Sequence, residues 1–379
     1  MSSSYLLASV SRAIEVVNHL QQIHGESVSL LELARQTGIH KTTVLRVLRT
    51  LEHHGWVVQP APGRYRAAIR FSGHRPHRIA YSSRDNRLAF PRAVTASVTR
   101  CAAARGVELL AFDNRASRAQ TLRNAERMVR EKVDLAIVFQ AESSTGPELA
   151  TRFNEAGVPL ISIDMAIAGA FYFGADNYQA GLTAGRAMAR ALLEPGGGPA
   201  PEELILVDTP RFGSLPAARL QGFVSGFQKH YPQAGGIATA TLDSRGSFEV
   251  GLRLLRARMR AARRRGIAVC VSDPAALGAV QAIEETGRAR DWRVWSFGGG
   301  ADVRQELRRP GSPLFGAIGF APESYGDQLW TLVAPLLANK PAAPALFART
   351  KVLTRQNIDS VYPQDQLNPE PANEASALT

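Results

Sequence analysis

Apolar residues recur at helical spacing in three blocks of the first 51 residues. Residues 10–23, 30–37 and 41–51 each carry apolar side chains three or four positions apart, which places them on one face of a helix. Ser29 precedes the second block, and Glu32 follows it by three residues, the pattern of a capping box. Gly38 and Gly55 then end the second and third helices. The pattern predicts three helices with a short turn between the last two.

Two short strands, residues 56–59 and 64–67, follow around a Pro- and Gly-containing turn and predict a hairpin. Three helices and a hairpin in this order are typical of a winged helix-turn-helix. Apolar positions 44, 47, 48 and 51 form one stripe of the third helix, so its polar donors are left facing outward. The residues expected to contact DNA are these donors and three on the hairpin: Lys41, Thr42, Thr43, Arg46, Arg49, Arg64, Tyr65 and Arg66. A winged helix that docks on protein is the alternative.

From residue 78 onward, short apolar runs alternate with helical segments of 10–15 residues. The runs predict strands at 78–82, 106–112, 135–139, 158–164, 204–207, 268–271 and 294–297. Such alternation favours an α/β fold with a parallel, doubly wound sheet. In folds of this class, ligands bind at the carboxyl ends of the strands.

Positive charge is concentrated at the start of the chain. The formal net charge is +12, and residues 1–78 hold ten Lys and Arg against four Glu. A small basic unit indicates a polyanionic partner, and double-stranded DNA is the first candidate. The Arg-rich segment 253–265 is interpreted instead as an ordinary helix with a solvated basic face.

Several classes of protein are disfavoured by the sequence. No apolar run approaches the roughly 18–20 residues of a membrane helix, and no secretory signal is recognised. Two distant cysteines, Cys101 and Cys270, do not make a disulfide framework. Together these features predict a cytoplasmic protein without membrane contact.

Catalytic signatures are also missing from the sequence. No histidine follows a strand of the α/β part, and there is no phosphate-binding loop, dinucleotide fingerprint or metal-ligand cluster. We therefore expect no cofactor, no metal and no catalysis. A sugar-active enzyme with a protein-docking winged helix is the alternative, and turnover of a candidate sugar would distinguish the two.

The N-terminal residues resemble a known family. Segments 29–48, 51–57 and 63–66 together are similar to the IclR-type DNA-binding domain over about 65 residues. IclR-type proteins normally carry a GAF-like effector domain behind this unit, and the remainder of this chain does not resemble one.

The second part resembles the ribose-type periplasmic binding protein fold, which LacI-type regulators share. Segments 158–164, 174–181, 218–223 and 272–279 carry the resemblance, and 354–359 looks like the family's closing strand. The resemblance implies two lobes hinged around a cleft, with chain crossings near Asp176, Phe320 and Thr350.

The expected organisation combines the two resemblances. A DNA-binding domain spans 1–71, a linker 72–78, a two-lobed ligand domain 79–360 and a disordered tail 361–379. The first lobe is expected at about 79–176 and 321–349, and the second at about 177–320 and 350–360. The combination implies a homodimeric transcription regulator whose operator affinity is controlled by a small polar ligand.

Mapped residue by residue, the resemblance places twelve residues at the cleft. These are Arg84, Asp85, Phe90, Phe139, Gln140, Asp164, Arg219, Asp273, Phe297, Gly298, Phe320 and Glu323. A carboxylate accepting hydroxyl protons and an aromatic face against a ring would suit a sugar or sugar-like ligand.

Two positions depart from the sugar-binding pattern. Sugar-binding members commonly have Asp-Arg where this chain has Asp164-Met165, and an Asp where it has Gly298. Other small polar metabolites are therefore alternatives. Asp164 could instead cap its strand, Arg219 could hold its helix in place, and Asp176-Asn177 is expected to fix the crossover rather than touch ligand.

Overall fold

The computed structural model describes residues 7–23, 27–68, 77–140, 142–195, 197–261 and 263–367. The chain forms two compact units, Met1–Pro76 and His77–Thr379. Most of the linker expected at 72–78 and the tail beyond residue 367 lie outside the described residues. No helix in the described ranges is both long and apolar enough to cross a lipid bilayer.

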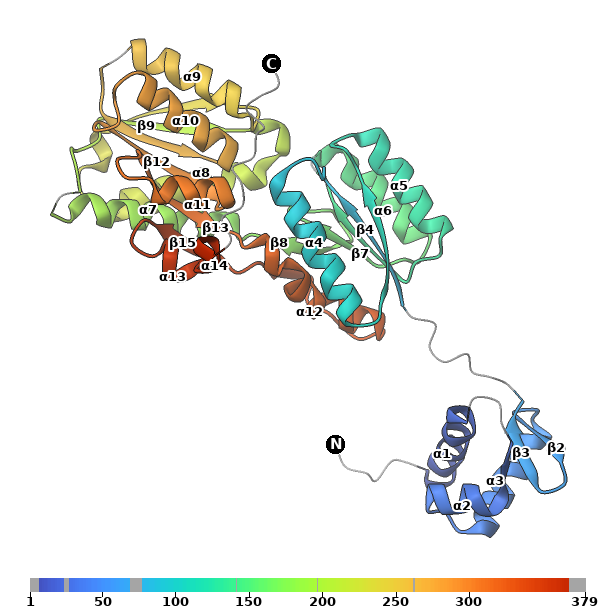
Figure 1. Ribbon diagram of the computed structural model, residues 1–379. Helices are drawn as coiled ribbons and strands as arrows, with labels where there is room; N and C mark the ends of the chain where they lie inside the picture. The colour runs from blue at the N-terminus through green and yellow to red at the C-terminus, as the bar shows by residue number, and fades with distance from the viewer. Residues whose placement is uncertain are drawn as a thin grey trace. The chain divides into compact units, whose positions relative to one another are not determined.

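The N-terminal unit contains three helices and a small three-stranded sheet in the order β1-β3-β2 (Figure 1). Its elements are α1 (Ala8–Gln22), β1 (Val28–Ser29), α2 (Leu30–Thr37), α3 (Lys41–His53), β2 (Val57–Ala61) and β3 (Arg64–Ala67). The predicted capping box is present, because Glu32 N donates to Ser29 Oγ at 3.2 Å and Ser29 N donates to Glu32 Oε2 at 2.9 Å. Gly38 ends α2 in the left-handed conformation with φ 68°, which glycine adopts without a Cβ penalty.

The core of this unit is built mainly from the three helices. Val16, Leu33, Val44 and Leu48 are fully buried there. The apolar stripe expected along the first helix is only partly correct, because Val10 and Ile14 are 51% and 55% exposed. Both positions belong to a second apolar face of α1, separate from the face that packs on α2 and α3.

The second unit contains two six-stranded sheets. The first has the order β14-β8-β7-β6-β4-β5 and the second β10-β9-β11-β12-β13-β15. All pairs are parallel except β13 with β15. The strands of the first sheet are β4 (Arg78–Ser83), β5 (Glu108–Asp113), β6 (Leu135–Phe139), β7 (Leu160–Ile163), β8 (Phe171–Gly174) and β14 (Ala345–Phe347). Those of the second are β9 (Glu203–Asp208), β10 (Ala238–Asp243), β11 (Gly266–Cys270), β12 (Trp292–Gly298), β13 (Leu314–Gly319) and β15 (Lys351–Thr354).

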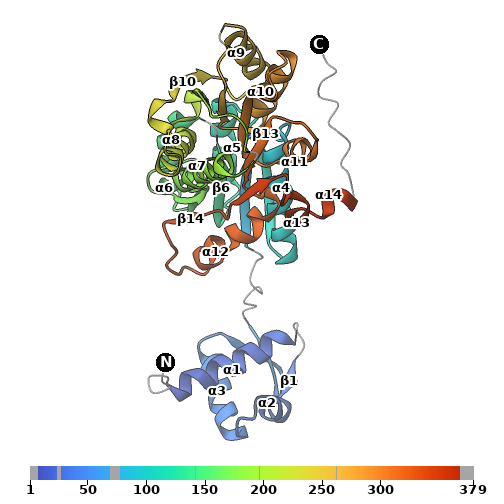
Figure 2. The same ribbon diagram turned by 90° about the vertical axis from the view of Figure 1, so that its left-hand side faces the viewer.

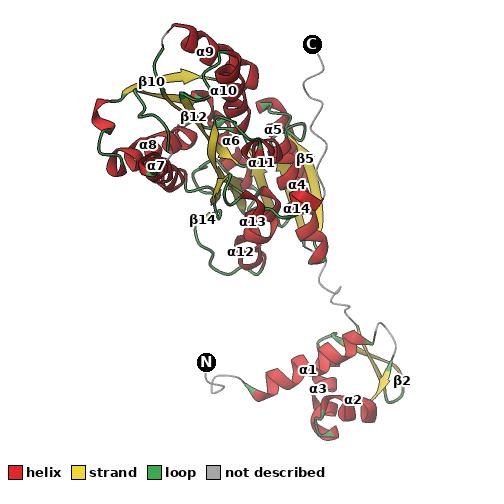
Figure 3. Ribbon diagram, turned by 60° about the vertical axis from the view of Figure 1, so that its left-hand side comes forward, coloured by secondary structure: helices red, strands yellow, loops and turns green. Residues whose placement is uncertain are grey.

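Helices flank both sheets, as the secondary-structure colouring of Figure 3 shows. The larger ones are α4 (Ala89–Ala104), α5 (Arg118–Arg130), α6 (Gly146–Glu155), α7 (Asn177–Leu193), α8 (Ser214–His230), α9 (Phe248–Ala261), α10 (Asp273–Glu285), α11 (Ala301–Arg308) and α12 (Tyr325–Leu337). Short segments are η2 (Ser143–Thr145), η3 (Pro210–Phe212), η4 (Ala234–Gly236), η5 (Pro322–Ser324), α13 (Ile358–Val361) and α14 (Gln364–Leu367). The predicted doubly wound α/β architecture is therefore confirmed.

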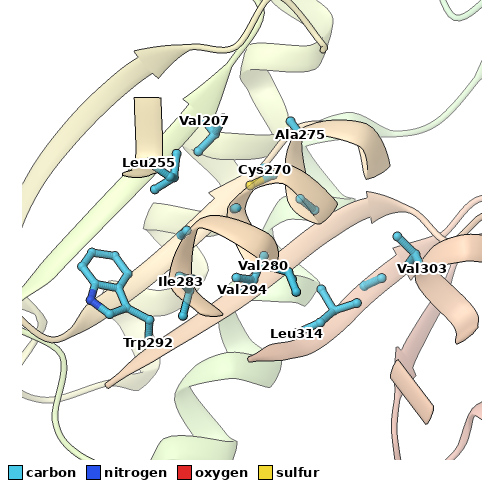
Figure 4. Packing of buried hydrophobic residues seen from close by; sticks show 14 of the residues in the cluster. Val207, Leu255, Cys270, Ala275, Val280, Ile283, Trp292, Val294, Val303 and Leu314 are labelled. Atoms are coloured by element: carbon cyan, nitrogen blue, oxygen red, sulfur yellow. The ribbon is translucent and has the colours of Figure 1, made fainter. Parts of the chain in front are cut away.

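Apolar side chains fill the layer between each sheet and its helices. In the second sheet, Leu255 of α9 and Val280 and Ile283 of α10 pack over Cys270 and Val294 (Figure 4). All are at least 96% buried. Cys270 is a core residue, as expected for a free cysteine with apolar neighbours.

The chain passes between the two sheets three times. It leaves β8 for α7, leaves β13 for α12, and leaves β14 for β15. The closing strand expected at 354–359 is wrong in its position, because β15 ends at Thr354 and residues 358–361 are helical. A hydrogen bond from Thr354 N to Asn357 Oδ1 (2.8 Å) turns the chain there.

The expectation of a disordered tail at 361–379 is wrong for residues 361–367. Asp365 of α14 accepts hydrogen bonds from Arg304 Nε (2.7 Å) and Arg308 Nη1 (3.1 Å) of α11. Two ion pairs on a partly buried carboxylate hold residues 361–367 against the second sheet's helical layer.

Helices α7 and α8 lie side by side at unusually short range (Figure 2). Glycines line the contact on both helices: Gly181 and Gly185 on α7, and Gly222 and Gly226 on α8. A Cβ atom at any of them would lie 2.1–2.3 Å from a carbonyl oxygen of the other helix. Only glycine permits this approach, which also sets the positions of Asn177 and Arg219 near the starts of the two helices.

Candidate functional site

The outward face of α3 presents the polar residues predicted to contact DNA. Lys41, Thr42, Arg46 and Arg49 are exposed, and Thr43 is half-buried. Opposite them, Val44 and Leu48 are fully buried. Thr42 Oγ1 lies 2.8 Å from His40 Nδ1, which fixes its side chain at the start of the helix. The helix therefore has one apolar face in the core and one basic face available to a partner.

On the hairpin, only two of the three predicted donors point outward. Arg64 and Arg66 are exposed, whereas Tyr65 between them is 94% buried and packs in the core. The expectation that Tyr65 lies on the outer face is wrong, because side chains alternate between faces along a strand. Arg64 Nε donates to Ser27 Oγ at 3.0 Å, so its guanidinium is also tied to the segment before β1.

In the second unit, polar side chains from strands, strand ends and helices gather around one carboxylate. We call Arg84, Asp164, Tyr172, Arg219 and Tyr325 the central cluster. The other four residues each interact electrostatically with Asp164. Arg84 and Arg219 are the two cations that act on its carboxylate. Residues far apart in sequence thus meet around one acid, at the edge where ligands bind in parallel α/β folds.

Asp164 directly follows β7 and adopts a left-handed backbone conformation with φ 56°. Its Oδ1 atom is buried and has no hydrogen-bond partner among the described residues. Burial raises the pKa of this carboxyl, and the charges of Arg219 and Arg84 act in the opposite direction. A Cβ on Gly174 would lie 2.5 Å from Oδ1 and 2.6 Å from the Tyr172 hydroxyl, so glycine makes room for both side chains.

Arg219 of α8 contacts the start of α7 and the residues that follow β11 and β13. Its Nε donates to Asn177 Oδ1 (2.5 Å) and its Nη1 to the carbonyl of Val271 (2.9 Å). Its guanidinium carbon lies 4.6 Å from the centre of the Phe320 ring. Burial lowers the pKa of Arg219, and nearby Asp164 offsets part of that effect. Arg219 therefore holds its surroundings in place, as one alternative expected, and its contact with a ligand remains a prediction.

Asn177 has the structural role expected for the crossover. Its Nδ2 donates to the carbonyl of Ala175 (3.1 Å), and Asp176 caps α7 by accepting from Gln179 N (3.1 Å). These contacts stabilise the N-terminus of α7, where the chain crosses from the first sheet to the helices of the second.

Aromatic rings surround the central cluster. Phe90 contacts Phe139, Phe320 and Tyr325 edge-on, with ring centres 6.4, 6.4 and 5.7 Å apart. Phe139 and Phe320 are at least 96% buried, while Phe90 remains partly exposed. Phe297 is 99% buried in the core of the second sheet, and contact of its turn with a ligand remains a prediction.

Polar groups of other predicted ligand residues are occupied by protein partners. Asp85 accepts from Arg87 Nε (2.9 Å) and Nη2 (2.8 Å), which lowers the pKa of the carboxyl. Gln140 Nε2 donates to Thr145 Oγ1 at 3.0 Å. The Glu323 side chain is exposed, and its carbonyl accepts from Ser97 Oγ at 2.7 Å. Ligand contact by these residues remains a prediction.

Asp273 supports the turn that contains Gly298. Its carboxylate accepts from Ser296 Oγ (2.5 Å), Gly299 N (3.2 Å) and Gly300 N (2.7 Å). A Cβ at Gly298, whose φ is 155°, would lie 2.4 Å from this carboxylate. Glycine at position 298 therefore makes room for the Asp273 carboxylate.

Five buried polar atoms near these strand ends lack a hydrogen-bond partner among the described residues. They are Ser83 Oγ, Arg84 Nε, Asp164 Oδ1, Ser272 Oγ and the Tyr325 hydroxyl oxygen. Leaving such an atom unpaired costs about 1–3 kcal/mol, so each calls for an explanation, and a ligand is one.

Sequence reasoning missed Tyr172, Ser272 and Tyr325. Ser272 follows closely after β11, so the strand-end rule could have found it. Tyr172 and Tyr325 lie inside a strand and at the start of a helix, and no local signal marks either. Within the described ranges, no group of three or more His, Cys, Asp or Glu residues could hold a metal ion.

Known families and structures match both units. Residues 79–341 match the periplasmic binding protein domain, and residues 9–61 match the IclR helix-turn-helix domain. No curated protein matches the chain. Among solved structures, a periplasmic solute-binding protein from Actinobacillus succinogenes with bound D-allose is 16% identical with a TM-score of 0.67. The match covers 75% of this chain and 99% of that one.

Two further structures show the same fold. A solute-binding protein from Bacillus halodurans with bound myo-inositol is 17% identical, with a TM-score of 0.66 over 77% of this chain and 99% of that one. One from Agrobacterium vitis with bound α-D-tagatopyranose is 19% identical, with a TM-score of 0.63 over 74% and 96%. At these identities the likeness establishes the fold alone. The chain belongs to the periplasmic binding protein domain family, and it carries an IclR helix-turn-helix domain in front of that fold.

Proposed function

We propose that this protein is a cytoplasmic, DNA-binding transcription regulator whose operator affinity is controlled by a small polar ligand of the sugar type. The observation that carries the proposal is that one chain contains two features, each suited to a different partner. The N-terminal unit exposes a basic helix face, and the second unit holds buried, unpartnered polar atoms at its strand ends. Sugars bound by structurally similar proteins support the ligand class.

In this function, the ligand acts through a difference in affinity between two forms of the second unit. Such coupling between two sites is typically about 1–3 kcal/mol. The matching experiment selects DNA sequences with the full-length protein and then screens sugars for release or tightening of the selected DNA. A pure protein that selects no DNA sequence would refute the proposal.

The first prediction concerns Arg46 on the exposed face of α3. Replacing Arg46 by Ala should weaken binding to the selected DNA by about 1–3 kcal/mol, because a bidentate base contact is lost. The exposed position means that folding should be unaffected. Fluorescence anisotropy with specific and scrambled duplexes measures the change. Arg253→Ala, an exposed arginine of α9, is the matched control, and equal affinities of the two variants would remove Arg46 from the interface.

The second prediction concerns oligomeric state. A single winged helix makes few base contacts, so we propose a homodimer that binds paired half-sites. Leu7, directly before α1, and Val10 and Ile14 of α1 are 71%, 51% and 55% exposed at i, i+3 and i+7, an apolar face that a second copy would cover. Light scattering should give a dimer mass, and Ile14→Glu should lower dimer stability, whereas Arg12→Glu should not. A monomer protecting one asymmetric half-site would contradict the homodimer.

A further inference from the structure

Arg84 of the central cluster and Arg211 both contact the aromatic ring of Phe212. The guanidinium carbon of Arg84 lies 4.2 Å from the centre of the Phe212 ring, and that of Arg211 lies 4.7 Å from it. Arg84 follows β4 of the first sheet, and Arg211 and Phe212 belong to η3 after β9 of the second. Two like charges are therefore held together at carboxyl strand ends.

Neither guanidinium has an ion-pair partner among the described residues. The nearest acid in sequence, Asp85, forms its salt bridge with Arg87. The other acid that acts on Arg84 is Asp164, which also acts on Arg219. Arg84 and Arg219 thus share the carboxylate of Asp164, and Arg211 adds a further positive charge near Arg84, so positive charge is in excess at this place.

Solvent reaches Arg211 more freely than Arg84. Arg211 is exposed, but Arg84 is largely buried and its Nε atom has no hydrogen-bond partner in the described part of the chain. Burial and the charge of Arg211 both lower the pKa of Arg84, and the charges of Asp164 and Asp85 offset part of that effect. An oxyanion bound beside the two arginines would offset this repulsion and accept a hydrogen bond from the free Nε of Arg84.

Building on the proposed function, we infer that the ligand is an anionic sugar derivative whose carboxylate or phosphate is bound by Arg84 and Arg211. Planar guanidiniums match both oxyanions through paired hydrogen bonds. The unpartnered Asp164 Oδ1, Ser272 Oγ and Tyr325 hydroxyl are suited to the hydroxyl groups of the same molecule.

The test compares neutral sugars with their anionic counterparts on the full-length protein. D-Glucose, D-galactose and D-ribose are each measured beside their aldonates and terminal phosphates by thermal shift and calorimetry at constant ionic strength. Inorganic phosphate against chloride is an additional probe. The variants are Arg84→Gln and Arg211→Gln, and Arg253→Gln makes the same charge change on an exposed residue of α9 that forms no ion pair in the described ranges.

We expect at least one anionic probe to bind saturably and at least tenfold more tightly than its neutral counterpart. Each of Arg84→Gln and Arg211→Gln should weaken that binding at least tenfold, whereas Arg253→Gln should leave it unchanged. Preference for aldonates over sugar phosphates, or the reverse, identifies which oxyanion the site takes.

Three results would overturn the inference: no saturable binding of any anionic probe, equal or tighter binding of the neutral sugars, or the same affinity in the Arg84, Arg211 and Arg253 variants. A neutral sugar that binds and alters DNA affinity would leave the proposed regulator intact and refute only the anionic class. Failure to select any DNA would instead refute the proposed function itself.

Discussion

Replacing Gly222 by Ala is expected to destabilise the second unit by about 1–3 kcal/mol, the usual cost of overpacking a rigid contact. The new Cβ would lie 2.2 Å from the carbonyl oxygen of Tyr178 and 3.0 Å from Leu182 N. Both are backbone atoms of α7, so the two helices must separate. The higher helix propensity of Ala, about 1 kcal/mol, offsets only part of this cost. A fall in Tm of roughly 2–10 °C follows for a unit of this size.

Gly235→Ala is the matched control, since nothing lies within 4 Å of its Cβ position. Scanning calorimetry and urea titration of both variants separate packing from general effects of glycine replacement. Gly222 also precedes Phe223 by one residue and follows Arg219 by three, so a shift of α8 should weaken ligand binding as well. A Gly222 variant as stable as the Gly235 variant would show that α7 and α8 tolerate a wider separation.

Asp164→Asn is expected to abolish the ligand's effect on DNA while making the ligand-free protein more stable at neutral pH. The side chain is isosteric, and Asn adopts φ values near +56° as readily as Asp. The carboxylate that would accept ligand hydroxyls is lost, so affinity for the ligand should fall. DNA affinity without ligand should not change, because the DNA-binding unit does not contain this residue.

The pH dependence follows from the direction of the pKa shift. Burial raises the pKa of Asp164 in the folded state, so the folded protein binds more protons than the unfolded chain at intermediate pH. The contribution of Asp164 to stability is then fully present below its unfolded pKa of about 3.9 and is lost as the pH rises through the folded value. The stability advantage of the Asn variant should therefore be small near pH 4 and grow toward pH 7.

Urea unfolding at several pH values from 4 to 7.5, with DNA anisotropy in the presence and absence of ligand, measures both effects. If Asp164 instead serves only to cap β7, the Asn variant would be less stable at neutral pH and would still respond to ligand. That outcome would remove Asp164 from the ligand site.

Much of this molecule could be predicted because its signals are local. The capping box of Ser29 and Glu32 spans three residues, and the apolar stripe of α3 follows directly from helical periodicity. The alternation of apolar runs and helices predicted the doubly wound α/β fold of the second unit. The position of Asp164 at a strand end indicated it as a candidate ligand residue. The inward position of Tyr65 was also readable, because it alternates with Arg64 and Arg66 along one strand.

The partners of each polar group were decided by tertiary structure alone. Asp164 and Asp273 look alike in sequence, since both stand near strand ends. Folding brings Ser296, Gly299 and Gly300 to Asp273, whereas Asp164 retains a buried oxygen without a partner. Tyr325 and Arg211 likewise lie near residues more than 100 positions away in sequence, Asp164 and Arg84 respectively. Local sequence determines where helices and strands form, but hydrogen-bond pairing and excess charge depend on which distant strand ends the sheets bring together.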